Sequence, residues 1–305
     1  MVRKKKGIAL LITLIFIIAI TASIGIGLKY VNDASDETKS DGFLFQNRVI
    51  VKDFLEILKT STELDEIAKN KSPEGLYNFL LRSENIQLNS SGVDINIEIT
   101  SARAKINPNT FMDKNNTINK EKIEIVKQYF ANYMLNDTYV EILLDNMNGI
   151  KKDNSYRTGI FNEKPYLFRD YIASKEHLYE INDFYEKAYY ENSLKNINFD
   201  NLFYFTQDRG TIIDINYATA EVWEMILGVN RERAIFLASG TGSYIDEPSL
   251  SLSDEESLKL KQFKFSYFEP YLNVNIKVSN FGNKSEINFI YNLENKKGFE
   301  FNYDI

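Results

Sequence analysis

An uncharged apolar segment near the N-terminus, from Ile8 to Leu28, constrains this chain more than any other feature. It holds about 21 residues, and as a helix it would span roughly 31 Å, the thickness of a bilayer's hydrocarbon core. A basic cluster from Arg3 to Lys6 precedes it, and such clusters stay on the cytoplasmic side of a membrane. We therefore expect a single membrane pass, with the rest of the chain on the opposite side.

Three interpretations of this segment are open. A cleaved signal peptide would end near Ala22, but the apolar stretch is long for one and no small-x-small site stands out. An uncut signal anchor is the second interpretation. The third is a long helix that leaves the lipid and continues, because apolar residues recur at i, i+4, i+7 and i+8 from Ile50 onward, on one helical face. Such a helix would lie half in lipid and half against a soluble domain.

Composition excludes several classes of function. The 305 residues, 44% of them hydrophobic, suit two domains better than one. The net charge is −7 and no long basic block follows Lys6, so the soluble part lacks the positive surface that nucleic-acid binding needs. The chain has no cysteine, which excludes disulfides, thiol nucleophiles and cysteine metal sites.

Period-2 alternation predicts strands at both ends of the soluble region. Residues 93–100 alternate strictly between apolar and polar, and a second strand is expected over residues 102–106. Near the C-terminus, residues 272–278, 287–291 and 299–303 alternate likewise and are separated by short turns, which predicts an antiparallel meander. The apolar face of a meander needs a cover, and the N-terminal helix carries the matching stripe.

Helical patterns fill the middle of the chain, from about Thr117 to Leu237. Pieces of helix are expected over residues 123–133, 139–144, 166–171, 178–190 and 220–238. This order predicts an α+β fold: a pilin-like long N-terminal helix packed on an antiparallel sheet, with a large mainly α-helical inserted domain. Three consecutive domains are the alternative, but they would leave residues 93–106 as an unstable pair of strands.

Several motifs, in this order, resemble the type II secretion system minor pseudopilin K family (general secretion pathway protein K). The basic leader that ends in Gly7 before an apolar helix resembles the wider type IV pilin and pseudopilin class. Asn107-Pro108-Asn109 resembles the strand end before the family's helical insertion. Residues 213–222 resemble its "I-N-V-N-T-A-P-A-E-V" segment, with Asp214 and Tyr217 as departures. Residues 168–181 resemble a further family region loosely, and residues 263–276 resemble the aromatic approach to its sheet strand.

By this resemblance the chain divides into a leader (1–7), the membrane half of the N-terminal helix (8–28), the first part of a pilin body (29–116), a helical insertion domain (117–262) and C-terminal antiparallel strands (263–305). A prepilin peptidase would cut between Gly7 and Ile8 and methylate the new N-terminus. Most pilins carry a glutamate at the fifth mature position, where this chain has Ile12. K-type members lack that glutamate, and an apolar residue suits a tip subunit, because a carboxylate in lipid is costly without a partner from a subunit above.

The resemblance implies a function in protein transport. The chain would cap the tip of the type II secretion pseudopilus, assemble with other minor pseudopilins and support export of folded proteins across the outer membrane. Inner-membrane lipid would hold it as a single-pass protein of the bacterial inner membrane, with the C-terminal domain in the periplasm. The alternative is a membrane-tethered minor type IV pilin for DNA uptake or adhesion.

A helix-hairpin-helix pattern over residues 215–238 bears on that alternative. The turn runs from Leu227 to Asn230, and Asn230 stands where DNA-binding versions carry a second glycine that lets backbone amides approach a phosphate. This departure and the acidic net charge favour a structural helix pair over a nucleic-acid site, so no nucleic-acid partner is expected.

The sequence carries no recognisable catalytic set. His177 is the single histidine, and a lone histidine in a helical segment is typical of a surface or capping residue. Residues 239–243 contain two glycines but no P-loop lysine, which indicates an ordinary loop. We therefore expect a protein that is not an enzyme.

Calcium is the one cofactor that the sequence suggests. Residues 145–154 are rich in oxygen ligands, and Asp145, Asn148 and Asp153 are the candidate calcium ligands. The segment lies roughly where the resembled family carries an acidic, calcium-binding stretch. Against this, it breaks EF-hand spacing, asparagines replace acids, and Lys151 and Lys152 intrude, so a solvated loop between helices is the alternative.

Overall fold

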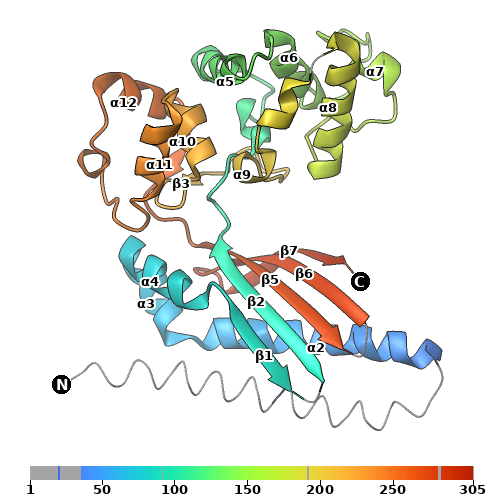
Figure 1. Ribbon diagram of the computed structural model, residues 1–305, viewed down its shortest axis with the longest axis vertical. Helices are drawn as coiled ribbons and strands as arrows, with labels where there is room; N and C mark the ends of the chain where they lie inside the picture. Colours follow the sequence, from blue (N-terminus) through green and yellow to red (C-terminus); the bar gives the residue numbers. More distant parts are fainter. Residues whose placement is uncertain (1–19, 21–35, 91, 191, 281–282, 305) are drawn as a thin grey trace. The chain divides into compact units, whose positions relative to one another are not determined.

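The computed structural model describes residue 20 and residues 36–90, 92–190, 192–280 and 283–304 (Figure 1). Gly7, Ile8 and Ile12, and the expected apolar span except residue 20, lie outside the described residues. Among the described helices, none combines the length and the apolar character that a membrane crossing requires. The chain forms two compact units, which we call the sheet unit, up to Ala102 and from Pro270 onward, and the helical unit, from Arg103 to Glu269.

The sheet unit contains one antiparallel sheet in the order β1-β2-β5-β6-β7 (Figure 1). The strands are β1 (Ile86–Ser90), β2 (Val93–Ser101), β5 (Tyr271–Asn280), β6 (Asn283–Asn292) and β7 (Lys297–Asp304). Strand β2 pairs with β5 along its whole length, from Val93 opposite Asn280 to Ser101 opposite Leu272. The helical unit is therefore an insertion between two directly paired strands, and the expected α+β fold with a helical insertion is confirmed.

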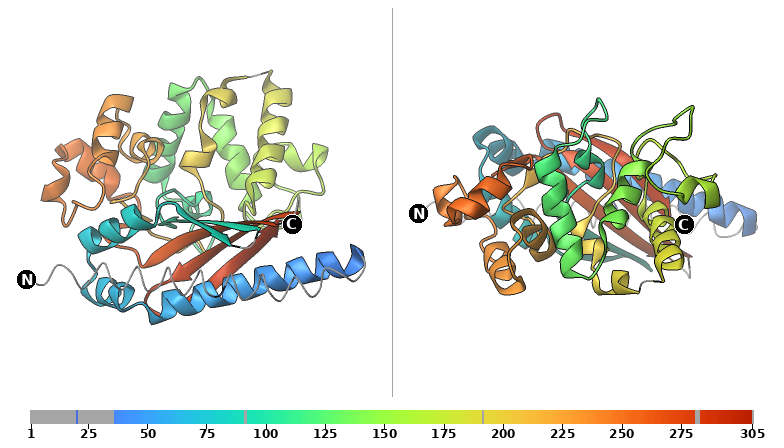
Figure 2. Two further views of the ribbon diagram at one scale, coloured as in Figure 1. Left: turned by 60° about the horizontal axis from the view of Figure 1, so that its bottom comes forward. Right: turned by 90° about the horizontal axis from the view of Figure 1, so that it is seen from above.

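Helix α2 (Asp36–Thr60) lies along one face of this sheet (Figure 2). Its buried apolar residues follow helical spacing: Phe43, Ile50, Val51, Phe54 and Leu58. The alternating residues of β2, β5 and β6 supply the opposing apolar surface: Val93, Ile95, Ile97, Ile99, Leu272, Val274, Ile276, Val278, Ile287, Phe289 and Tyr291. Burying one such side chain contributes about 1.5–3 kcal/mol, so this interface is the main source of the sheet unit's stability.

Two short helices complete the sheet unit, and local capping explains where they begin. Ser61 and Ser72 accept the backbone N–H groups of Leu64 and Gly75, which starts α3 (Thr62–Asn70) and α4 (Pro73–Ser83). Pro73 stands in the first turn of α4, where its missing N–H has no helical partner to lose.

The helical unit is built from short elements around one apolar core. Its longer helices are α5 (Lys120–Asn132), α6 (Asp137–Asn146), α8 (Lys175–Tyr189), α10 (Ala220–Leu227), α11 (Arg231–Ala238) and α12 (Asp254–Leu260). The shorter pieces are η1 (Pro108–Phe111), α7 (Ile160–Glu163), η2 (Ser193–Asn196), α9 (Phe199–Leu202) and η3 (Pro248–Leu250), and β3 (Ile213–Asp214) pairs in parallel with β4 (Phe265–Ser266). Fully buried aromatic side chains dominate the core, among them Trp223, Tyr139 and Tyr185.

Two expected elements are wrong. Residues 102–106 form no strand of the sheet, because after Ala102 the chain bonds inside the helical unit: Arg103 and Ala104 accept the N–H groups of Asp214 and Thr219, and Ile106 bridges to Phe203. Residues 166–171 form no helix. A single turn, closed by the Leu167 N–H on the Lys164 carbonyl at 3.2 Å, is followed by bends and not by helical bonds.

Candidate interaction surfaces

The helix pair α10 and α11 occupies the predicted helix-hairpin-helix. Helix α10 ends at Gly228, whose φ of +63° is left-handed and favours glycine. Asn230 then caps α11, because its side-chain oxygen accepts the N–H of Arg233 at 2.9 Å. The asparagine therefore meets a bonding need of the helix itself, at the position where a DNA-binding version would offer a free amide.

The basic side chains at this turn are also neutralised within the helical unit. Arg231 donates to Glu221 at 3.0 Å and to Glu224 at 3.3 Å. Arg233 pairs with Glu256 at 3.2 Å and lies over the ring of Phe236. A surface whose cations already hold carboxylates offers little charge for phosphate, which agrees with a structural role for the pair.

The candidate calcium ligands are placed in and after the last turn of α6. Asp145 is fully buried: one carboxylate oxygen accepts the Arg157 N–H at 3.1 Å, and the other accepts the Thr158 N–H at 2.7 Å and its hydroxyl at 2.8 Å. Asp153 is exposed and accepts the N–H of Ser155, which helps to hold its pKa below the usual range. Asn148 donates its backbone N–H to the carbonyl of Asp145.

In this geometry Asp145 is a poor cation ligand. Both of its oxygens already accept hydrogen bonds from the loop. Lys151 donates a hydrogen bond to the Ser155 carbonyl within the same segment. A calcium ion would have to displace those donors, so the residues as arranged do not fit the ion, and the calcium site stays an expectation from the sequence alone.

His177 is a buried structural histidine. Its Nδ1 accepts the N–H of Ala173 at 3.2 Å, so its Nε2 carries the proton and donates to Asn146 Oδ1 at 3.0 Å. Burial lowers the pKa of His177, because the charged imidazolium loses its hydration. The side chain thus joins the start of α8 to the end of α6. No three His, Asp or Glu side chains of the described ranges gather as a metal-binding set.

Arg209 connects three loops of the helical unit, and local sequence patterns do not reveal it. One terminal nitrogen donates to the Asp113 carbonyl at 2.9 Å and to Asn116 Oδ1 at 2.5 Å. The other donates to the carbonyls of Met147 and Asp170, both at 2.6 Å. The guanidinium therefore satisfies four oxygens from three separate segments, and its side chain is only 9% exposed.

Asp214 forms hydrogen bonds with both terminal residues of the helical unit, Arg103 and Glu269. Its backbone N–H donates to the carbonyl of Arg103, and its carboxylate accepts the N–H of Glu269 at 2.9 Å and of Asn216 at 3.1 Å. Asp214 has no exposed surface, and burial raises its pKa to about 7. The family motif carries an asparagine at this position, so the departure noted in the sequence falls on an anchoring residue.

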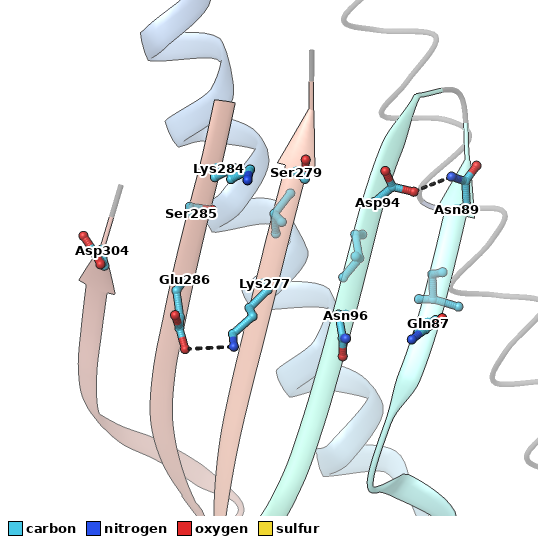
Figure 3. A pocket seen from close by; sticks show the side chains of 13 residues that line it. Gln87, Asn89, Asp94, Asn96, Lys277, Ser279, Lys284, Ser285, Glu286 and Asp304 are labelled. Carbon is cyan, nitrogen blue, oxygen red and sulfur yellow. Dashed lines mark hydrogen bonds and ion pairs between the residues drawn. The ribbon is translucent and has the colours of Figure 1, made fainter. Parts of the chain in front are cut away.

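The outer face of the sheet, away from α2, is polar and hollowed (Figure 3). One row crosses all five strands: Gln87, Asn96, Lys277, Glu286 and Asp304. Lys277 lies 3.7 Å from Glu286, and Asn89 donates to Asp94 in the neighbouring row. Because positive and negative side chains are mixed and partly paired, the hollow favours no ion of either sign.

Comparison with solved structures identifies a related architecture. No family model and no curated protein matches the sequence. A chain from the crystal structure of the GspK-GspI-GspJ complex of the enterotoxigenic Escherichia coli type 2 secretion system aligns with a TM-score of 0.56, over 88% of this chain and 99% of that chain. The two chains share a fold. At 13% identity the likeness is one of fold, and at that level it confirms the K-type resemblance that the sequence motifs indicate.

Proposed function

We propose that this chain is a minor pseudopilin of a type II secretion system and caps the tip of its short periplasmic filament. The observation that carries this proposal is the helical unit inserted between paired strands β2 and β5 of a helix-backed sheet, an architecture that aligns with 99% of a chain from the GspK-GspI-GspJ complex. The expected membrane segment directly before α2 supports it further.

The proposed mechanism is assembly rather than catalysis. The N-terminal helix packs against the helices of other minor pseudopilins. The sheet unit covers the half of this helix that lies outside the lipid. The helical unit adds bulk that a filament shaft could not accommodate, so no further subunit stacks above it. Until assembly, the apolar segment from Ile8 to Leu28 retains the subunit in the inner membrane.

Processing of the N-terminus tests this proposal most directly. A prepilin peptidase would remove residues 1–7 and methylate Ile8. Mass spectrometry of the protein purified from its own membranes should therefore find an N-terminal peptide that begins with methylated Ile8. A mature chain that still begins with Met1, or one cut near Ala22, would remove the pseudopilin proposal.

The DNA-uptake alternative makes a separate prediction. DNA binding by the soluble part would weaken steeply as salt rises, because phosphate contacts release counterions. The neutralised Arg231 and the capping Asn230 lead us to expect no such binding in a fluorescence titration with duplex and single-stranded DNA. Salt-dependent affinity that is lost in Arg231→Ala would favour the alternative instead.

A further inference from the structure

Strand β7 forms one edge of the sheet, and β6 is its strand partner (Figure 1). Every residue from Glu300 to Asp304 is exposed, and within the described residues no other strand pairs with the outer side of β7. A free edge carries a row of backbone N–H and C=O groups that another strand can join. Glu300 interrupts the strand with a φ of +54°, so the regular stretch follows it.

Aromatic side chains lead from the core to this edge. The ring of Phe289, which is buried, stacks on Phe301 with centroids 5.0 Å apart, and Phe301 stacks on Tyr303 at 6.4 Å. Phe301 and Tyr303 remain 39% and 44% exposed. Native edges are protected by lysine, proline, other charges or bulges; between Gly298 and Asp304 neither lysine nor proline occurs, and the protection is limited to the irregularity at Glu300 and the acid at Asp304. The exposed stretch from Phe301 to Asp304, after that irregularity, is the part that another strand can join.

The direction of β7 limits what can join it. Lys296, just before β7, donates to the Lys59 carbonyl at the end of α2, whereas Asn280, at the end of β5, donates to Gln46 nearer its start. Strands β5 and β7 are both antiparallel to β6, so both run opposite to α2. Each neighbouring pair of strands in the sheet is antiparallel, so strand direction alternates from β7 to β1. The other edge strand, β1, therefore runs in the same direction as β7.

We propose that the β7 edge is a docking site for an edge strand of a neighbouring pseudopilin anchored in the same membrane. This inference rests on the proposed function and names the surface through which that partner binds. A neighbour of the same topology, with its helix pointing the same way, presents either of its edge strands parallel to β7. Its alternating apolar residues then cover the rings of Phe301 and Tyr303.

A second copy paired antiparallel through β7 does not satisfy this geometry. Antiparallel pairing of β7 with itself would set the two α2 helices in opposite directions, because each α2 runs opposite to its own β7. Two chains anchored in one membrane by segments that precede α2 could not take that arrangement. Antiparallel pairing of two copies through β7 is therefore excluded, and the partner in this proposal is a different pseudopilin subunit that stands side by side with this one.

Site-specific photo-crosslinking in intact cells tests the docking edge. The full chain would carry p-benzoylphenylalanine in place of Tyr303, and in a matched control in place of Tyr190, which is 95% exposed in the helical unit. A third version would carry it in place of Phe45 on α2, which is 69% exposed. We expect position 303 to give one adduct with a chain that has its own basic leader and apolar N-terminal segment, joined at a strand of that chain.

The blocking variant Phe301→Lys should reduce the adduct at position 303 at least tenfold and leave the adduct at position 45 unchanged. A melting curve close to that of the unblocked protein excludes misfolding as the cause. No adduct at 303, an adduct joined at a helix of the partner, or one to a second copy through β7, would overturn the docking edge. If the docking edge fails this test but position 45 still crosslinks to a pseudopilin, the proposed function stands. A mature chain that keeps its leader would contradict both the docking edge and the proposed function.

Discussion

Asp214 is a buried carboxyl group whose two roles conflict. Its carboxylate anchors the backbone N–H groups of Asn216 and Glu269, and those bonds favour the charged form. Burial opposes them and is the larger effect, so the pKa of Asp214 rises from 3.8 to about 7. The position therefore suits a hydrogen-bond acceptor, but burial disfavours the negative charge of the carboxylate.

The substitution Asp214→Asn should change how stability depends on pH. Because the folded pKa lies above the unfolded one, the contribution of Asp214 to stability is full below about pH 4 and is lost as pH rises to about 7. Three pKa units correspond to about 4 kcal/mol. Denaturant unfolding of both full chains in detergent measures this. Between about pH 4 and pH 7 the free energy of unfolding of Asp214→Asn should rise relative to that of the wild type, and above pH 7 the difference should stay constant. A difference that does not vary with pH would contradict the raised pKa.

The four hydrogen bonds of the Arg209 side chain predict that its replacement destabilises the helical unit. Replacing Arg209 with methionine leaves four oxygens without their charged donor, so the free energy of unfolding should fall by about 3 kcal/mol or more. The exposed Arg157 is the matched control: Arg157→Met keeps the backbone N–H that binds Asp145 and should change stability by less than about 0.5 kcal/mol. Equal melting temperatures for the two variants would rule out the role of Arg209.

Calcium can be tested on the same protein. The oxygens of Asp145 already accept three donors, so millimolar calcium should leave the melting temperature of the wild type unchanged. A rise that is abolished by Asp145→Asn and by Asp153→Asn would instead establish the calcium site that the sequence suggests. A rise that both variants retain would place a bound ion elsewhere.

At the scale of elements, close packing between α2 and β7 depends on a glycine. A Cβ on Gly298 would lie 2.8 Å from Phe301 Cζ and 2.9 Å from Leu55 Cδ2, both closer than carbon atoms normally approach. Because both contacts are with the ends of side chains that can shift, Gly298→Ala should lower the free energy of unfolding by about 1 kcal/mol, the low end of the overpacking range. At Gly159 a Cβ would have Asn162 Nδ2 as its nearest neighbour, at 3.9 Å, so Gly159→Ala serves as the control. Chemical denaturation of the two variants compares them.

The elements that the sequence predicts best are those with strict local periodicity. Alternation alone predicts β2 and β5, because one face of each strand is buried and the other is not. Strand β1 alternates too, since Ile86 and Leu88 flank Gln87, but a pattern of three residues is too short to predict a strand by itself. Residues 102–106 look like a strand and are not one, because their backbone groups bond to several separate segments, around residues 202, 214 and 219, and not to one neighbouring strand.

The candidate site was harder to predict than the fold. Arg209 and Asp214 act through contacts with residues 39 to 111 positions distant, and no local spacing encodes such contacts. Asn230 is the contrasting case. Its position before a helix, with a glycine two residues earlier, is a recognisable local signal for a cap, and the structure shows Asn230 capping α11.

At the scale of the whole molecule, the insertion point makes the helical unit removable in principle. Ser101 pairs with Leu272, and the N–H of Ala102 donates to the carbonyl of Tyr271, so the two ends of the gap already lie side by side. Joining Ala102 to Tyr271 through an Asn-Gly turn would keep this register and convert β2 and β5 into a hairpin. We expect this shortened chain to fold with one cooperative transition and a strand-rich circular dichroism spectrum; an unfolded product would show that the sheet unit needs the insertion.

The shortened chain also separates the two parts of the proposed mechanism. If bulk is what ends the filament, a subunit without its helical unit should still enter complexes with other minor pseudopilins but should no longer limit filament length. Longer surface filaments in cells that carry only the shortened chain would agree with this. Filaments of unchanged length, with the shortened chain present at normal levels, would mean that the helical unit does not act as a steric cap.

The remaining prediction concerns Ile12, which lies outside the described residues. A carboxylate within an apolar membrane segment costs about 3 kcal/mol unless a neighbouring subunit supplies a partner, and that energy corresponds to roughly a hundredfold in association. A subunit at the tip has no neighbour above it, so Ile12→Glu should reduce co-purification with other minor pseudopilins and lower secretion. Ile12→Gln, of similar shape but uncharged, should have a smaller effect. If Ile12→Glu assembles and secretes like the wild type, this position gives no support for a place at the tip, whatever the rest of the chain does there.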